Sequence, residues 1–473
     1  SVFGGNVNGD FTVSNGTLSA SGNVSFDGGT IKLDGNFPTG TGNVALGDAA
    51  LDDGSLSGAA NTAIGSSALS ANTSANSNTA IGFAAMDVNT TGALNTAVGQ
   101  DALGANTTAS NGTAVGYQAL FVNTTGADNV AIGYQALDAN TTAANNTAVG
   151  STALGANTTG GSNVAVGKGA LDANTTGTTN IAIGVNALGA NTTASDNVAV
   201  GHSALLTNTT GTKLTAVGYE SLDANTTGDQ SSAFGYAALT ANTTGNQSTA
   251  VGTSSLTTNT TGSSHVAVGF EALKANTTAS NNTGIGYRAL LSNTTGANNT
   301  ALGYEALKDN TTGAQNVAIG MYGLANNTTA SENFAGGYNA LGANTTGASN
   351  IGIGHRTLQS NTTASNNTAV GFEALKSNTT AGSSVAIGTS AGYSQTTNGQ
   401  NVFVGQSAGY YTDGYKNCYV GFNAGDAMTT GDNNTIIGSF SGNENGLDIR
   451  TSNNQIVLSD GDGNVRITND ASY

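Results

Sequence analysis

The stretch NVAIGYQALDANTTAAN, residues 129–145, is one copy of a unit that recurs along most of the chain. NTAVGSTALGANTTGGS follows it directly, and NVAVGKGALDANTTGTT comes next. The glycine of the unit stands at every seventeenth position from Gly65 to Gly405. A leucine that begins at Leu103 and an asparagine that opens the NTT tripeptide keep the same period. Because a disordered tract has no reason to keep three positions in phase, this regularity predicts a folded repeat protein.

The 17-residue unit predicts one coil of a parallel β-solenoid. It is too short for a two-helix repeat, and Gly, Asn and Thr in every copy disfavour helix. NVAIG has β-branched residues at alternate positions and ends in glycine, which is typical of a strand, while NTTG is typical of a turn. We therefore expect an all-β solenoid of about 24 coils, whose strand spacing of about 4.8 Å gives a rod on the order of 110 Å long.

The chain divides into four segments on this pattern. Residues 1–42 lack the unit, and their alternating, glycine-punctuated pattern predicts a β-rich segment. Residues 43–388 carry the repeats of the predicted solenoid. In residues 389–442 glycine replaces the leucine and aromatic residues become frequent. Residues 443–473 predict a terminal β-hairpin with strands at 456–458 and 465–467 around SDGDGN.

Alternation along the strand suggests which side chains fill a coil. Val130 and Ile132 lie on one face of the strand and Ala131 on the other. We expect Val130, Ile132 and Leu137 inside the coil. Ala131 and Gly133 would then form a smooth outer face that packs against identical chains around a three-fold axis; the alternative is a lone solenoid with a narrow interior.

The NTT asparagines have a structural and a covalent interpretation. As a buried ladder, each amide would satisfy backbone groups at a corner and bond the next asparagine. As sequons, the same residues would accept glycans in a host that glycosylates them, but a spacing of one coil crowds a full glycan coat. The ladder is the favoured interpretation, and whether any sequon is glycosylated stays open. Its predicted members include Asn89, Asn106, Asn123, Asn140, Asn157 and Asn174.

An aromatic residue often follows the repeat glycine, as at Tyr117, Tyr134 and Tyr219. Such a row of rings would either bind sugar or stack as a stiffening ladder, and we favour stacking.

Catalytic and metal-binding patterns are missing from the sequence, so we predict no enzyme activity, cofactor or metal. The three histidines, His202, His265 and His355, occupy variable positions in separate units, and no phosphate loop, zinc pattern or GxSxG motif occurs. Asp460, Asp462 and Asn464 share part of the spacing of a calcium loop but lack its glycine and glutamate.

Acidic side chains recur at one position of separate units, where they predict solubilising charges: Glu220, Glu271, Glu305 and Glu373.

Net charge and hydropathy limit the partners. The formal charge of −17 and the lack of a Lys/Arg cluster disfavour nucleic acid as a partner. The sequence contains no run of 18 apolar residues, so we predict no membrane insertion. We expect the chain to partner itself, as a trimer or fibril, and to contact a cell-surface glycan or protein receptor.

Two families share motifs with this chain. NVAIG, NTAVG and NVAVG resemble the head repeats of trimeric autotransporter adhesins, which implies a parallel β-roll packed as three chains, although the likeness covers only the strand. NVFVGQSAGY, NTIIGSFSGN and GLDIRTSNNQIVLSDGDGNVR are similar to repetitive phage tail-fibre and virion structural proteins, and these segments extend the likeness over most of the chain. The resemblance implies a stiff homotrimeric tail fibre on a virion surface that presents a receptor-binding end.

Two other functions stay open. One is a bacterial surface adhesin or self-assembling extracellular fibril. The other is an ice- or carbohydrate-binding solenoid, which the single outward Thr per coil, one of Thr141 and Thr142, does not favour for ice.

Overall fold

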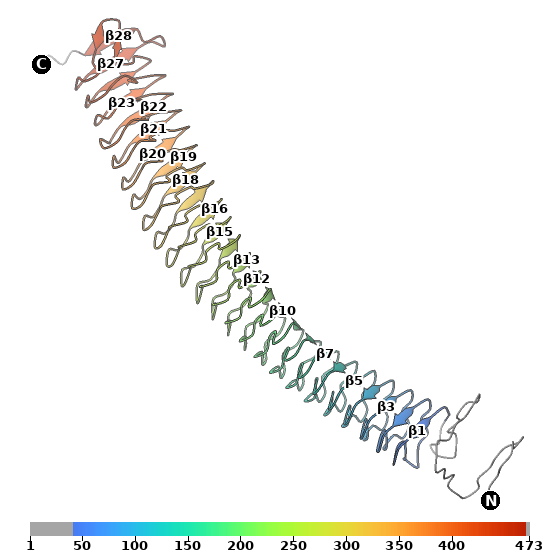
Figure 1. Cartoon of the computed structure of the whole chain (residues 1–473). Coiled ribbons are helices and arrows are strands. Elements are labelled where there is room, and N and C mark those ends of the chain that lie inside the picture. The colour runs from blue at the N-terminus through green and yellow to red at the C-terminus, as the bar shows by residue number, and fades with distance from the viewer. Residues whose placement is uncertain (1–40, 470–473) are drawn as a thin grey trace, which may run out of the picture.

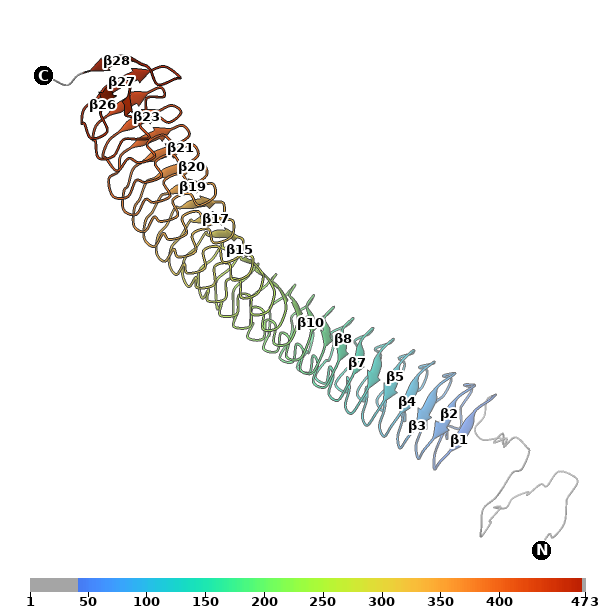
Figure 2. The same ribbon diagram turned by 45° about the horizontal axis from the view of Figure 1, so that its top comes forward.

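The structure is a computed structural model that describes residues 41–469. Over this range the chain contains 28 strands and no helix. The backbone winds into a long, gently curved solenoid in which the strands of successive coils lie side by side, with β1 at one end and β28 at the other (Figures 1 and 2). The predicted all-β parallel solenoid is confirmed.

The first 24 strands have three residues each, and the last four have two to five. Their bounds are β1 Val44–Leu46, β2 Thr62–Ile64, β3 Thr79–Ile81, β4 Thr96–Val98, β5 Thr113–Val115, β6 Val130–Ile132, β7 Thr147–Val149, β8 Val164–Val166, β9 Ile181–Ile183, β10 Val198–Val200, β11 Thr215–Val217, β12 Ser232–Phe234, β13 Thr249–Val251, β14 Val266–Val268, β15 Thr283–Ile285, β16 Thr300–Leu302, β17 Val317–Ile319, β18 Phe334–Gly336, β19 Ile351–Ile353, β20 Thr368–Val370, β21 Val385–Ile387, β22 Val402–Val404, β23 Cys418–Val420, β24 Thr435–Ile437, β25 Asn443–Glu444, β26 Leu447–Asp448, β27 Ile456–Ser459 and β28 Val465–Asn469.

Each strand from β1 to β24 pairs in parallel with its equivalent in the next coil. The partner of Val130 is Thr147 and the partner of Ala131 is Ala148, so the register equals the 17-residue period. The turns are bonded along the axis as well: the Leu137 amide donates to the Ala153 carbonyl at 2.9 Å and the Thr141 amide to the Thr158 carbonyl at 3.1 Å. Backbone hydrogen bonds therefore join neighbouring coils around the whole circuit, which makes the stack stiff.

The repeat glycine has a physical reason at every coil. Gly133 has φ 139°, a conformation that side-chain-bearing residues rarely adopt. A Cβ placed on it would lie 2.5 Å from the carbonyl oxygen of Gly150 in the next coil. Only glycine allows the coils to approach this closely.

The interior of the coil is narrower than predicted. Leu137 is fully buried, as expected, but Ile132 is 40% exposed and Val130 is only partly buried. Ala131, which we expected on the outside, is fully buried. The prediction that Val130 and Ile132 lie inside the coil is therefore wrong. The prediction that Ala131 and Gly133 form a smooth outer face is wrong as well, because Ala131 is buried. The leucine reaches inward from the turn and fills the space beside the strand, so only a methyl group fits at the inward strand position.

The sharp turns depend on residues other than glycine in the left-handed region. Gln135, Leu137 and Asn145 have φ of 50°, 54° and 63°, and their equivalents repeat these angles along the solenoid. Asn accepts this region readily, whereas Gln and Leu do so at a cost of about 1–2 kcal/mol each. The buried leucine contacts and the hydrogen bonds between coils hold these angles in place.

In the coils near the C-terminal end, the alanine position of the core carries a large residue and the leucine position carries a small one. The buried strand position carries Phe403 and Tyr419 in place of alanine, and the leucine position carries Gly392, Gly409 and Gly425. A Cβ on Gly409 would lie 2.4 Å from the Phe403 ring, and one on Gly425 would lie 2.6 Å from the Tyr419 ring. The ring thus fills the space that leucine fills elsewhere.

A hairpin ends the sheet. β24 pairs in parallel with β27, and β27 pairs antiparallel with β28, over the stretches that the sequence indicated. The expected β-rich segment 1–42 lies outside the described residues except for residues 41 and 42.

Candidate functional surface

The outward face of the long sheet is the most extensive apolar feature on the described part of the chain. The first and third positions of each strand point away from the core, since the second is buried throughout β2–β24. We call the row of first and third positions the apolar stripe; the third position is apolar in every strand from β1 to β24 except β18, where it is Gly336, and the first position is threonine or serine in half of these strands. Its most exposed large members are Leu46, Ile81, Ile132, Val166, Ile181, Ile183, Phe234, Val251, Val266, Leu302, Ile319, Ile351, Ile353, Ile387 and Ile437.

The NTT asparagines form a hydrogen-bonded row inside the coil, at the turn that precedes the next strand. The Asn140 side-chain amide donates to Asn123 Oδ1 at 2.8 Å and to the Ala143 carbonyl at 3.0 Å, and its own Oδ1 accepts from Asn157 at 3.1 Å. Asn106 donates to Asn89 at 2.7 Å, and Asn174 donates to Asn157 at 2.8 Å. All six predicted positions are fully buried. We name this row the corner ladder.

Burial of the corner ladder bears on the sequons. The amide nitrogen that would carry a glycan makes two hydrogen bonds within the coil at Asn140. A glycan attached there would replace one of the two amide hydrogens, would break at least one of these bonds and would need to leave the core. The folded coils are therefore incompatible with glycosylation at these buried asparagines.

A second buried asparagine row escaped the sequence analysis. Asn129, just before β6, donates to the Ala143 carbonyl at 2.8 Å and accepts from the backbone amide of Asn146 at 2.9 Å. Asn146 repeats this pattern with Gly160 and Asn163. The signal was present, because an asparagine precedes most strands at the 17-residue period.

The aromatic residues after the repeat glycine stack along the axis. The ring centroids of Tyr117 and Tyr134 are 5.5 Å apart, and those of Tyr287 and Tyr304 are 5.0 Å apart, with nearly parallel planes. His202 stacks on Tyr219 in the same row, and His355 lies between Tyr338 and Phe372. Two of the three histidines are therefore members of the aromatic row.

The third histidine occupies the second asparagine row. His265 is 1% exposed and stands where most coils have asparagine. Burial lowers the pKa of its imidazole from the ordinary value of 6.5 to about 4. The ring is therefore neutral at pH 7, and it accepts weakly from the Asn282 backbone amide at 3.4 Å.

Three of the four recurring glutamates, Glu271, Glu305 and Glu373, form ion pairs with a lysine three residues later, and Glu271 and Glu373 also pair with an arginine of a neighbouring coil. Glu271 accepts from Lys274 at 2.7 Å and from Arg288 in the next coil at 2.8 Å. The hydrogen bond from Lys274 has the largest effect on the pKa of Glu271, and together with that from Arg288 it lowers this pKa. Glu373 pairs with Lys376 at 2.8 Å. Such pairs add modest stability to neighbouring turns.

Metal and membrane features give no candidate site within residues 41–469. No group of three His, Cys, Asp or Glu side chains there is arranged to hold a metal ion. Asp460 instead closes the terminal hairpin: it accepts from the backbone amides of Asp462 and Asn464 and from Arg466. Over the same range, no helix is long and apolar enough to cross a membrane.

In comparisons with known proteins, the chain matches no family model and no curated protein.

Proposed function

We propose that this protein is a structural fibre, whose coils stack into a stiff extracellular rod that associates with copies of itself through the apolar stripe. The observation that carries the proposal is the continuous parallel pairing of β1–β24, which aligns outward side chains, most of them Val, Ile or Thr, along the rod. Monomeric soluble proteins rarely expose apolar patches beyond a few hundred Å². A stripe that runs the length of a solenoid is typical of an interface.

The energetics favour a second copy of the chain as the occupant of the stripe. Ile132 is 40% exposed, and covering that fraction contributes on the order of 1 kcal/mol per coil. Over 24 coils the gross gain is on the order of 20 kcal/mol, compared with roughly 4–15 kcal/mol for lost freedom on association. A partner must follow the same coil spacing over the same length, which another copy of this rod does.

A homotrimer of such rods, displayed on a virion as a tail fibre, is the arrangement that we propose. The strand motif shared with trimeric adhesin heads and the segments shared with phage fibres support it.

Mass photometry and negative-stain electron microscopy of the purified chain test the proposal. We expect particles of three times 46.2 kDa, seen as single curved rods. Replacing four stripe residues with lysine, at Val166, Ile183, Val200 and Val217, should shift the mass to that of one chain.

The matched control places four lysines in the same coils at an exposed threonine row, at Thr176, Thr193, Thr210 and Thr227. These positions are exposed and lie outside the stripe. A wild-type chain that stays monomeric at micromolar concentration would refute self-association, and equal effects of the two variants would refute the stripe as the interface.

A further inference from the structure

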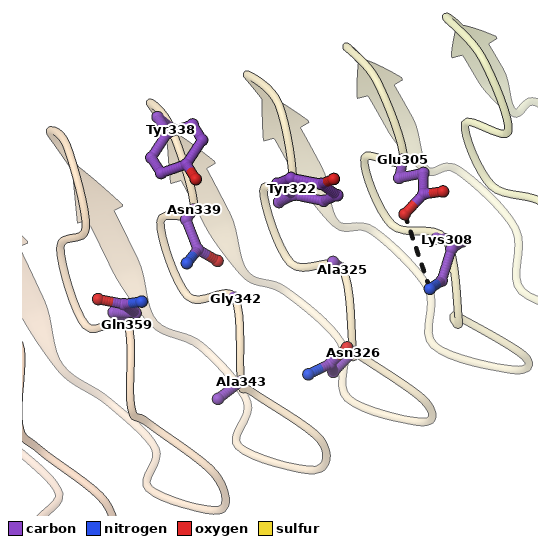
Figure 3. A pocket seen from close by; sticks show the side chains of 10 residues that line it. All are labelled: Glu305, Lys308, Tyr322, Ala325, Asn326, Tyr338, Asn339, Gly342, Ala343 and Gln359. Atoms are coloured by element: carbon purple, nitrogen blue, oxygen red, sulfur yellow. Dashed lines mark ion pairs between the residues drawn. The ribbon is translucent and has the colours of Figure 1, made fainter.

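A groove of about 450 Å³ interrupts the regular surface of the solenoid beside the aromatic row, in the coils that follow β16, β17, β18 and β19 (Figure 3). Its floor arises from one position, the residue after the core leucine. That position carries Ala325 and Gly342 in two successive coils, whereas Lys308 precedes them and Gln359 follows. Two small residues between two long ones leave a depression about two coils, or roughly 10 Å, in length.

At the same place, one ring of the aromatic row is shifted by one residue and turned relative to its neighbours. Met321 occupies the ring position of its coil, and the tyrosine comes one residue later, at Tyr322. The Tyr322 ring lies edge to face with Tyr304 at 5.5 Å and 85° and with Tyr338 at 6.3 Å and 75°. Tyr322 and Tyr338 both line the groove (Figure 3). The parallel stacking seen between neighbouring rings such as Tyr287 and Tyr304 is interrupted here.

The polar groups that line the groove have unused hydrogen-bonding capacity. The side-chain amides of Asn326, Asn339 and Gln359 make no hydrogen bond within the described residues, although Gln135 elsewhere in the solenoid bonds Gln118 at 3.0 Å. Each amide offers two donors and an acceptor. At one end, Lys308 lies 3.7 Å from Glu305.

We propose that this groove binds a short neutral oligosaccharide. A pyranose ring combines an apolar face, which packs on tyrosine, with hydroxyls that pair with amide groups as both donors and acceptors. The groove volume falls within the range of small-molecule sites, about 300–1,000 Å³. The net charge of −17 and the Glu305 carboxylate disfavour polyanions. This binding activity is separate from the structural role, and it does not depend on the number of chains in the rod.

The test is a soluble oligosaccharide array probed with the full chain, followed by titration calorimetry on the best binder. The array carries cello-, chito-, manno- and galacto-tetraose, with a sialylated tetrasaccharide as the acidic comparison. We expect at least one neutral tetraose to bind. Tyr322→Ala should weaken that binding at least tenfold because it removes the ring at the groove edge.

Gly342→Leu places a side chain in the groove and should leave the backbone of the coil unchanged. Leucine occupies the equivalent position in other coils, at Leu206 and Leu291, and a side chain at Gly342 meets the movable amide of Asn339. We expect this variant to lose binding and keep its thermal unfolding transition. Gly155→Leu makes the same change at the equivalent position of a coil outside the groove and should bind like wild type.

Two results would overturn the proposal: no neutral tetraose binds the wild-type chain, or binding survives both Tyr322→Ala and Gly342→Leu. Preferred binding of the sialylated probe would also refute it. Because the oligomer mass is measured separately, each of these outcomes leaves the fibre proposal unaffected.

Discussion

Replacing one repeat glycine by alanine, Gly133→Ala, is the sharpest perturbation of the stacking described above. Two penalties add at this position. The backbone φ of 139° lies in a region that costs a residue with a Cβ about 1–3 kcal/mol. The new Cβ would also lie 2.5 Å from the carbonyl oxygen of Gly150, an overlap with backbone that a side-chain rotation does not relieve.

The expected loss exceeds about 4 kcal/mol, which places this variant among the exceptional single substitutions. Because each coil contacts only its neighbours, the damage should be local, and the rod should open between the coils of Gly133 and Gly150. Chemical denaturation measures the free-energy change, and limited proteolysis with mass spectrometry locates the opened segment.

Gly155→Ala is the matched control. Its position takes larger residues in other coils, and the nearest atom to its Cβ is the movable Asp172 carboxylate at 2.9 Å. We expect a change within about 0.5 kcal/mol, as for an ordinary surface substitution. Equal destabilisation by the two variants, or no new cleavage near residue 133, would refute the close-stacking explanation.

Three further predictions concern the interior. Asn140→Ala should destabilise the chain by about 2–4 kcal/mol in chemical denaturation, because it removes the amide that bonds Asn123 and leaves buried polar groups unpaired. The pKa of His265 is about 4 in the folded chain, compared with 6.5 in the unfolded chain. Its contribution to the free energy of unfolding should therefore be constant above pH 7 and should fall by about 3 kcal/mol between pH 6.5 and pH 4, because only the unfolded chain takes up the proton there. Denaturation at a series of pH values measures this change. Phe403→Ala should cost about 3–5 kcal/mol in the same assay, since Gly409 leaves the vacated space unfilled.

Each of these predictions has an internal comparison. His265→Asn restores the residue that the other coils carry and should remove that part of the pH dependence; an unchanged profile would argue against the histidine. Adding Gly409→Leu to Phe403→Ala recreates the ordinary alanine–leucine pair and should recover part of the loss. For Asn140, the exposed neighbour Thr142→Ala should have little effect, and a comparable loss there would contradict the importance of the corner ladder.

The strand and the turn were predictable from residues 129–145, and the period from the recurrence of that stretch along the chain. A fixed spacing of glycine, leucine and asparagine over hundreds of residues has one economical explanation, which is one coil per unit, and the structure has that register. Burial of Leu137 also followed from the pattern, because a large apolar residue repeated in every coil has few other places to go.

Which side of the strand faces inward was decided only by the tertiary structure. Alternation separates Val130 and Ile132 from Ala131, but it does not say which set is buried. The width of the coil decides that: Leu137 enters from the turn, the remaining space admits only Ala131, and the branched side chains are left on the outer face. The same three-dimensional packing placed a second asparagine row inside the core and opened the groove at Tyr322. Sequence spacing determines which residues share a row, whereas the volume enclosed by the backbone determines what each row contacts.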